Sequence, residues 1–410
     1  MNSSFSSNRR RFLWLAGCGL AAGGGAYAYS RGIRLPVFHL VDNGPVTQWN
    51  ENGIEVLARG ACFQERAQDA FRFRAYVPEP VFEVRGDRAG AARIIVENLH
   101  GDATLQIEAT PPGGIDEERD NLTRVLDIRQ DPGTETRFSW RFPKPERYRF
   151  AAIGDTGGGT ELEWVMTRAV QLEADFLLHM GDFYYDEGDL ERAAANLNKA
   201  AIPTYAAIGN HDFHHGLRAV YPRFNRLIGP SNSLFTLGGI EFVNFDTAAD
   251  FIPAARGTRA QLVEALRPVD GGGDIRDRVA FTHKPLADPD PERDHDVDRA
   301  AEARWLRSRL LAAGTKDLLA GHIHVKEEFD DQGLYTYVTG QGLAHADLIV
   351  ERPYAEILLG DVEPGEPVRY QWQALNMPFE AHCSARNMGT LDVLERPDVK
   401  ARLLDLCGKA

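Results

Sequence analysis

Side chains able to bind metal ions follow short apolar segments at several places in this 410-residue sequence. Asp155 comes two residues after the apolar run 149–153, and Asp182 comes two residues after the run 176–180. The two oxygens of Asp182 could bridge two cations, and the hydroxyl of Tyr185 could serve a trivalent cation as a phenolate. The complete set of such residues is Asp155, Asp182, Tyr185, Asn210, His211, His283, His322 and His324.

The donor atoms in this set are oxygens and imidazole nitrogens, without a thiolate. Such a mixture suits iron, zinc or manganese better than copper or calcium. Burying so many polar groups at the ends of apolar strands without partners would cost much free energy, and a pair of metal ions would satisfy them. Each residue alone has an ordinary structural explanation, such as an aspartate that caps a helix. The whole set, in this order, favours a metal site.

The spacing of apolar residues indicates which elements carry this set. From residue 147 the sequence alternates between apolar strands and amphipathic helices, which predicts a parallel sheet with right-handed crossovers. The carboxyl ends of parallel strands share one edge, where ligands usually bind. Asp155, Asp182 and Asn210 are therefore expected to lie together. The predicted elements of this half are strand 149–153, helix 160–173, strand 176–180, helix 190–200 and strand 204–208.

The histidines follow predicted strands in the same way. Residues 279–282 form a short predicted strand that ends at His283, and the predicted strand 317–320 ends just before His322. Gly238-Gly239 lies between two apolar runs and predicts a hairpin. The other predicted elements are helix 299–313 and strands 334–338 and 368–372, which are expected to complete the sheet edge.

In this order, the blocks resemble those of the calcineurin-like metallophosphoesterases and, within them, the purple acid phosphatases. The resemblance covers about residues 147–375. The block with Tyr185 is the most discriminating, because most other members of the superfamily lack a tyrosine there. One difference is Ala280, three residues before His283, where the family usually has valine. The matching blocks are Gly154-Asp155-x-Gly157, Gly181-Asp182-x-x-Tyr185, Gly209-Asn210-His211, His283 and Gly321-His322-x-His324.

The resemblance implies an α/β metallophosphoesterase fold, in which central β-sheets are flanked by helices in an αββα sandwich. It also implies a binuclear centre of Fe(III) and a divalent metal (Fe, Zn or Mn), with Asp182 as the bridge. A hard phenolate suits the trivalent ion, whereas a neutral amide and imidazoles suit the divalent one. The implied ferric ligands are Asp155, Asp182, Tyr185 and His324, and the implied divalent ligands are Asp182, Asn210, His283 and His322.

The function that the resemblance implies is hydrolysis of small phosphate monoesters by attack of a metal-bound hydroxide. His211 would hydrogen-bond the phosphate or protonate the leaving oxygen, and Asp212 would orient the ring of His211. His214, His215 and Lys284 could add phosphate contacts or be ordinary exposed loop residues. Two alternatives stay open. One is a phosphodiesterase or alkaline phosphatase of the same superfamily, and the other is a non-catalytic phospholigand-binding envelope protein.

Ahead of this part, residues 35–145 show short alternating runs separated by turn residues such as Gly101-Asp102. Strands at this spacing predict a β-sandwich of immunoglobulin-like type. This segment contains no catalytic cluster, so the expected role is structural or substrate-framing. Pro143-Lys144-Pro145 has the composition of a linker to the catalytic domain, expected at 147–375, and residues 376–410 form a C-terminal tail.

The overall charge makes nucleic acid an unexpected partner. The formal net charge is -14, from 46 basic and 60 acidic residues, and binding of a phosphate backbone needs clusters of Lys and Arg. Small phosphate esters can still bind where a metal supplies local positive charge. A hydrophobic content of 43% and a charged content of 26% are those of an ordinary soluble globular protein.

Residues 1–28 have the pattern of an export signal. Arginines at 9–11 precede Phe12-Leu13, an uncharged apolar run extends to residue 26, and Ala26-Tyr27-Ala28 fits a cleavage site. The segment resembles a bacterial twin-arginine signal, which implies the twin-arginine export machinery as a partner and a periplasmic or secreted location. The apolar run is too short for a spanning helix, so no membrane span is expected after processing. The alternatives are a short membrane anchor and lipid attachment at Cys18.

Removal of this signal leaves three cysteines, Cys62, Cys383 and Cys407. An oxidising compartment allows a disulfide. Cys383 and Cys407 bracket the final segment and are the expected pair, which would leave Cys62 as the odd cysteine. The alternative is three unpaired, buried thiols.

Overall fold

The computed structural model describes residues 46–376, with gaps at 52–53, 68–69, 88, 110–113, 214–216, 250–256, 270–273, 291, 294 and 343–354. Several predictions of the sequence concern residues outside this description. They are the export signal 1–28, Cys18, His214, His215, the proposed Cys383–Cys407 pair and all of the tail after Asn376. Among the described helices, none has both the length and the apolar character that a membrane span requires.

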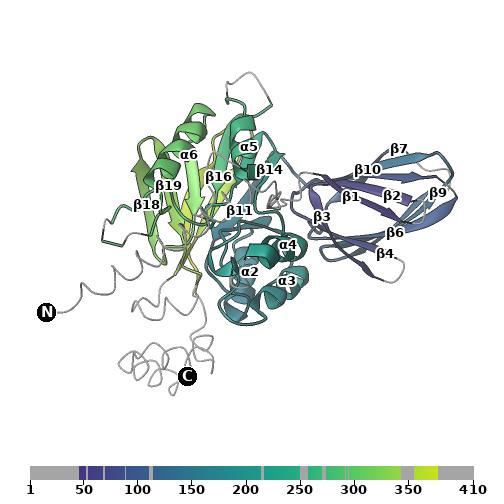
Figure 1. Ribbon diagram of the computed structural model, residues 1–410, viewed down its shortest axis with the longest axis horizontal. Helices are drawn as coiled ribbons and strands as arrows, with labels where there is room; N and C mark the ends of the chain where they lie inside the picture. Colours follow the sequence, from purple (N-terminus) through teal and green to yellow (C-terminus); the bar gives the residue numbers. More distant parts are fainter. Residues whose placement is uncertain are drawn as a thin grey trace, which may run out of the picture. The chain divides into compact units, whose positions relative to one another are not determined.

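Two five-stranded sheets form the N-terminal part (Figure 1). They share one hydrophobic core, in which Phe82, Phe138 and Trp140 of one sheet pack with Phe73 of the other. Cys62 on β3 is buried. The immunoglobulin-like type and the boundaries 35–145 stay predictions. The strand orders are β1(Val46–Glu51)-β2(Ile54–Arg59)-β5(Val81–Gly86)-β10(Glu135–Arg141)-β7(Thr104–Ala109) and β3(Ala61–Ala67)-β4(Ala70–Ala75)-β6(Gly90–Glu97)-β9(Thr123–Gln130)-β8(Ile115–Asp120).

Two mixed sheets form the part that carries the candidate site. The first has the order β13(Thr204–Ala206)-β12(Phe176–His179)-β11(Tyr148–Ile153)-β20(Glu356–Val362)-β21(Arg369–Ala374). The second has the order β14(Ser233–Leu237)-β15(Ile240–Asn244)-β16(Asp277–Phe281)-β17(Asp317–Ala320)-β19(Leu334–Thr339)-β18(Lys326–Asp331). β11, β12 and β13 are parallel to one another, as predicted, and β14 and β15 form the predicted hairpin at Gly238-Gly239.

Strand β11 shows how these sheets are layered. Alternate residues of a strand point to opposite faces. Phe150 and Ala152 enter the core between the sheets together with Phe242 of β15, whereas Ala151 and Ile153 pack under helices. The apolar residues 150–153 of this strand are therefore covered on both faces.

Helices complete the outer layers (Figure 1). α2(Thr160–Gln171), α3(Asp189–Lys199) and α4(Leu217–Leu227) share a core with the first sheet. α5(Gly257–Ala265) and α6(Ala300–Ala312) share a core with the second. The predicted αββα layering is thus confirmed.

The sequence prediction was wrong about the place of one strand in its sheet. The predicted strand 334–338 is not an edge strand, because β19 lies between β17 and β18 in the second sheet. β20, which the sequence did not predict, lies antiparallel beside β11 in the middle of the first sheet. The physical reason is that an apolar pattern reports the burial of a strand, whereas its neighbour is selected by long-range backbone hydrogen bonds.

The side chain of Asn98 ties the N-terminal part to the strand that leads to Asn210. Its Oδ1 accepts the N–H of Thr204 at 2.9 Å, and its Nδ2 donates to the carbonyl of Thr204 at 2.9 Å and to that of Ala75 at 2.7 Å. Asn98 is almost fully buried. Because Thr204 is the first residue of β13, these bonds help to fix the strand that ends shortly before Asn210.

Candidate metal centre

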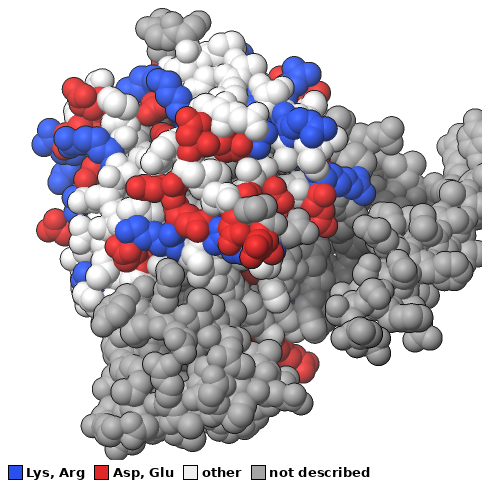
Figure 2. Space-filling model, turned by 90° about the vertical axis from the view of Figure 1, so that its left-hand side faces the viewer, with Lys and Arg blue, Asp and Glu red and all other residues white. Residues whose placement is uncertain are grey.

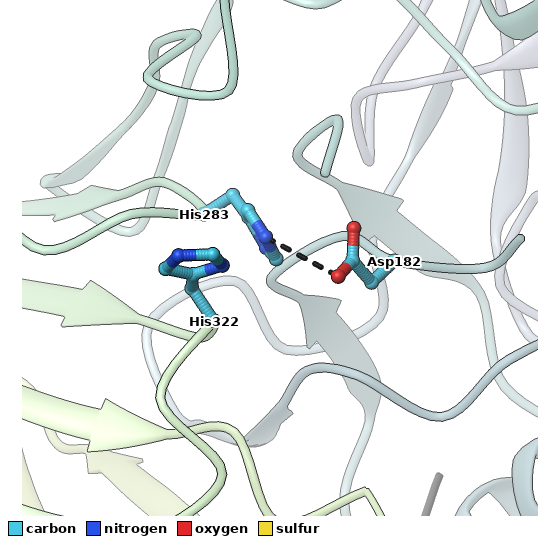
Figure 3. Close-up of side chains that lie close together, drawn as sticks. All are labelled: Asp182, His283 and His322. Atoms are coloured by element: carbon cyan, nitrogen blue, oxygen red, sulfur yellow. Dashed lines mark ion pairs between the residues drawn. The ribbon is translucent and has the colours of Figure 1, made fainter. Parts of the chain in front are cut away.

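The strand ends bring Asp182, Asn210, His283 and His322 together. His283 Nε2 lies 2.7 Å from Asn210 Oδ1 and 3.4 Å from Asp182 Oδ2. The ring centroids of His283 and His322 are 5.0 Å apart. Ligand atoms of Asp182, His283 and His322 all lie within 4.8 Å of one another, and Figure 3 shows His283 between the other two. These are the four residues predicted for the divalent ion.

The residues predicted for the ferric ion also lie close to one another. His324 Nε2 is 3.4 Å from Asp155 Oδ1, and the hydroxyl of Tyr185 is 3.4 Å from Asp182 Oδ2. One oxygen of Asp182 therefore lies near both the phenol of Tyr185 and the imidazole of His283. This is the position required of a bridging carboxylate. All seven predicted ligands are thus neighbours, and their binding of metal stays a prediction.

The donor atoms around His283 fit a cation. Nδ1 of this ring lies 2.6 Å from the carbonyl oxygen of Met180. A carbonyl only accepts, so Nδ1 carries the hydrogen and donates it. Burial lowers the pKa of His283 to about 4, so at neutral pH its Nε2 has a free electron pair. That pair faces the oxygens of Asn210 and Asp182, and three electron-rich atoms converge where a cation would satisfy them.

Burial and nearby charges set the protonation of the other ligands. Burial, and then the proximity of His283, lower the pKa of His322 to about 2, which keeps this imidazole neutral and able to bind a metal. Burial, followed by the charges of Asp155 and Asp212, raises the pKa of Asp182 well above its ordinary value. Ionised Asp155 and Asp182 repel each other, and a shared positive ion removes that repulsion.

The backbone at the ligands is held in an uncommon conformation. Asp155, Asp182 and His322 have φ values of 65°, 62° and 67°, in the left-handed region that costs non-glycine residues on the order of 1 kcal/mol or more. Glycine makes the close approach possible, because a Cβ on Gly209 would lie 2.0 Å from Asp182 Oδ1. Strain of this kind persists where the surrounding structure enforces it, and it is frequent at functional sites.

His211 lies at the edge of the cluster. Its backbone N–H donates to Asp182 Oδ1 at 2.9 Å, its ring centroid is 4.6 Å from that of Tyr185, and the residue is exposed. The imidazole is therefore accessible from solvent beside the predicted ligands. A side chain in this place can contact a substrate without being a ligand.

Asp212 accepts hydrogen bonds from the backbone around Asp182. Its buried carboxylate accepts backbone N–H bonds from Gly209 at 2.8 Å, Phe183 at 2.9 Å and Asp182 at 3.2 Å. These bonds fix the turn that carries Asp182. That Asp212 orients the ring of His211 stays a prediction. Burial raises the pKa of Asp212 to about 7.

His179, at the end of β12, supports the site but is not among the residues predicted from the sequence. Its Nδ1 accepts the N–H of Gly181 at 3.2 Å, so its Nε2 donates to Thr156 Oγ1 at 2.9 Å. Thr156 in turn donates to the carbonyl of Gly157 at 2.8 Å. Burial lowers the pKa of His179 to about 3, which keeps the ring neutral for this chain of bonds. His179 thereby joins the loops of Asp155 and Asp182, and a histidine inside an apolar strand was the available signal.

The loop after His283 lies close to the predicted divalent site. The ring centroid of His295 is 5.7 Å from that of His322. Lys284 forms an ion pair with Asp298 at 3.6 Å. The backbone N–H of Lys284 donates to Thr247 Oγ1 at 2.7 Å, which fixes the backbone next to His283.

Part of the sequence that carries this site matches a known protein family. Residues 148–326 match the family model described as calcineurin-like phosphoesterase. No curated protein matches the sequence.

Solved structures with a similar fold share little sequence with this chain. One is PhoD, with 13% identity over 77% of this chain and 85% of that chain and a TM-score of 0.41. Another is a dimetal phosphatase from Danio rerio, with 12% identity over 56% and 96% of the two chains and a TM-score of 0.40. A third is GAP50, the anchor in the inner membrane complex of Plasmodium, with 11% identity over 56% and 85% and a TM-score of 0.40. The family assignment rests on the sequence match and not on these structures.

Replacement of Asp182 tests the electrostatics of the cluster. We expect Asp182→Ala and Asp182→Asn to lose bound metal and hydrolytic activity. Because the folded state raises the pKa of Asp182, its ionisation destabilises the metal-free protein as pH rises. Metal-free Asp182→Asn should therefore have a higher melting temperature than metal-free wild type at pH 8, and a smaller difference at pH 5. Equal melting temperatures at both pH values would contradict this account.

Proposed function

The chain belongs to the calcineurin-like phosphoesterase superfamily through residues 148–326, and from this premise we propose that it is a binuclear, metal-dependent phosphatase of the purple acid phosphatase type. The reaction is hydrolysis of a phosphoester bond. The proposed substrates are small phosphate monoesters.

The position of Tyr185 is the observation that carries this proposal. Its hydroxyl lies 3.4 Å from Asp182 Oδ2, the oxygen that also lies near His283. A phenolate is a hard, anionic ligand and stabilises Fe(III) more than a divalent ion. A tyrosine beside the bridging carboxylate therefore favours a ferric ion in the half of the centre that Asp155 and His324 complete.

The ligand atoms divide into two shells that share Asp182. When bound, two cations would polarise the phosphate ester and lower the pKa of a water molecule. Asp155, Tyr185 and His324 would hold the trivalent ion, and Asn210, His283 and His322 would hold Fe, Zn or Mn in the divalent state.

His211 is the proposed proton donor. Its exposed ring lies beside Tyr185, where it can hydrogen-bond the phosphate or protonate the leaving oxygen. The bond from this residue to Asp182 comes from its backbone. The ring can therefore exchange a proton while the bridging carboxylate keeps its place.

The proposed location of the protein rests on residues 1–28, and the proposed size of its substrate rests on the net charge. The twin-arginine pattern in residues 1–28 supports export by that machinery to the periplasm or outside the cell, with lipid attachment at Cys18 as the lesser alternative. The net charge of -14 supports a small phosphate ester over nucleic acid. Lys and Arg are intermixed with Asp and Glu on the described part of one face (Figure 2), which agrees with that preference.

Metal analysis combined with a substrate screen tests the function. We expect purified protein to contain iron and to hydrolyse an aryl phosphate monoester faster than the matching diester. Faster hydrolysis of the diester would favour the phosphodiesterase alternative. Tight binding of phosphate without hydrolysis of either ester would favour a non-catalytic phospholigand-binding protein.

Tyr185 should give the protein a colour. A tyrosinate bound to Fe(III) has a charge-transfer band in the visible, and we expect Tyr185→Phe to abolish this band. The matched control is Tyr184→Phe, because Tyr184 is buried in the core beneath the helices and its loss should leave the band in place. A colourless, zinc-only wild-type protein would exclude the purple acid phosphatase type and leave the superfamily intact.

His211→Ala should lower turnover while the metal content stays near that of wild type. A general acid contributes about 10²–10⁴-fold to a rate, and the loss should be larger for an alkyl phosphate than for a nitrophenyl phosphate, whose leaving group needs no proton. Turnover measured on both esters checks this. Full activity of His211→Ala on the alkyl ester would show that the assigned role is wrong.

A further inference from the structure

The buried carboxylate of Asp189 lies next to the turn that carries Tyr185. Asp189 is the first residue of α3 and is fully buried. Its Oδ2 accepts the backbone N–H of Tyr185 at 3.0 Å and that of Asp186 at 2.7 Å. Its own N–H donates to the carbonyl of Asp186 at 3.0 Å. One residue thus closes the turn 185–189 through both its side chain and its backbone.

These bonds go beyond the usual role of an acidic residue in the first turn of a helix. Such a residue interacts favourably with the helix dipole. The N-cap of α3 is Gly188, with a φ of 83° and no side-chain cap. The carboxylate of Asp189 reaches back to amides that precede the helix. It therefore acts on the turn that leads from Tyr185 into α3.

The same helix touches the loop that follows Asp155. A Cβ on Gly158 would lie 2.0 Å from the carbonyl oxygen of Asp189, which shows how closely the two backbones approach. Asn196, two turns further along α3, donates to the carbonyl of Gly158 at 3.1 Å. The start of α3 thus fixes the Tyr185 turn and the Asp155 loop relative to each other.

Arg192 balances the buried charge. Its guanidinium pairs with Asp189 Oδ1, whereas the two N–H bonds from the turn go to Oδ2. The side chain of Arg192 is 51% exposed. Arg192 therefore offers a control, because its removal leaves the bonds from Asp189 to the turn in place.

We propose that Asp189 is a positioning residue, which holds the backbone of Tyr185 so that the phenol oxygen stays beside Asp182. The proposal rests on the proposed function, in which Tyr185 binds the trivalent ion. The distance of 3.4 Å between the Tyr185 hydroxyl and Asp182 Oδ2 depends on the direction in which the turn presents the ring. Loss of the carboxylate frees two backbone amides and lets the phenol move away from the centre.

A double-mutant cycle with Tyr185 tests this. Asp189→Ala should weaken iron binding about 10-fold, the lower end of what the loss of a group that orients a metal ligand costs, and should shift or weaken the visible band per bound iron. Asp189→Asn should have a smaller effect, because an amide oxygen still accepts the two N–H bonds. Arg192→Ala should keep the visible band and the iron affinity of wild type, because the two N–H bonds to Asp189 Oδ2 remain. In a Tyr185→Phe background, Asp189→Ala should cause no further loss of iron.

Two results would overturn the proposal. One is an unchanged band and unchanged iron affinity in Asp189→Ala. The other is an equal loss of iron affinity with and without the Tyr185 hydroxyl, which would mean that Asp189 supports the fold in general. The melting temperatures of metal-free Asp189→Ala and of the milder variant Asp189→Asn, compared with that of metal-free wild type, identify a general loss of stability.

If the proposed function is wrong, the wild-type protein itself gives a different result. A wild-type protein without a visible band would refute the ferric site. The double-mutant cycle can then be repeated with the metal that the protein does contain. The amount of that metal retained by each variant would still show whether Asp189 acts through Tyr185.

Discussion

The convergence of electron-rich atoms at one point of the interior is the constraint on which the rest of the site depends. Asp155 and Asp182 are buried carboxylates, and the free electron pair of His283 faces oxygens of Asn210 and Asp182. Because these carboxylates are buried, hydration offsets little of the repulsion between them. A positive ion would remove that repulsion, which is the physical basis of the predicted metal site.

Backbone amides hold this unfavourable arrangement in place. Asp212 accepts three N–H bonds around the Asp182 turn, and Asp189 accepts two at the Tyr185 turn. His179 links the Asp155 and Asp182 loops through Thr156. Polar side chains with no role as ligands thus keep strained ligand backbones from relaxing, as left-handed residues such as Asp182 require.

Each of the two sheets carries some of the predicted ligands. The first sheet carries Asp155, Asp182 and Asn210 at the ends of its parallel strands, and the second carries His283 and His322 after β16 and β17. Their inner faces form one aromatic core, in which Phe150 and Phe176 pack against Phe242. Because that core is close-packed, one sheet cannot slide against the other without loss of contacts. This keeps carboxylates and imidazoles at metal-binding distances.

The sequence by itself determined which residues end the strands. Apolar runs before Asp155, Asp182 and His283 place these side chains at strand ends, since local periodicity reports burial. The order of the blocks also indicated the superfamily, which the match over residues 148–326 confirmed.

Only the tertiary structure decided which strands share a sheet, because β20 is placed by hydrogen bonds to β11, a strand far away in the sequence. It also decided the roles of Asp212, His179 and Asp189. The partners of these side chains are largely backbone N–H groups, which every residue except proline possesses and which therefore leave no mark in the sequence.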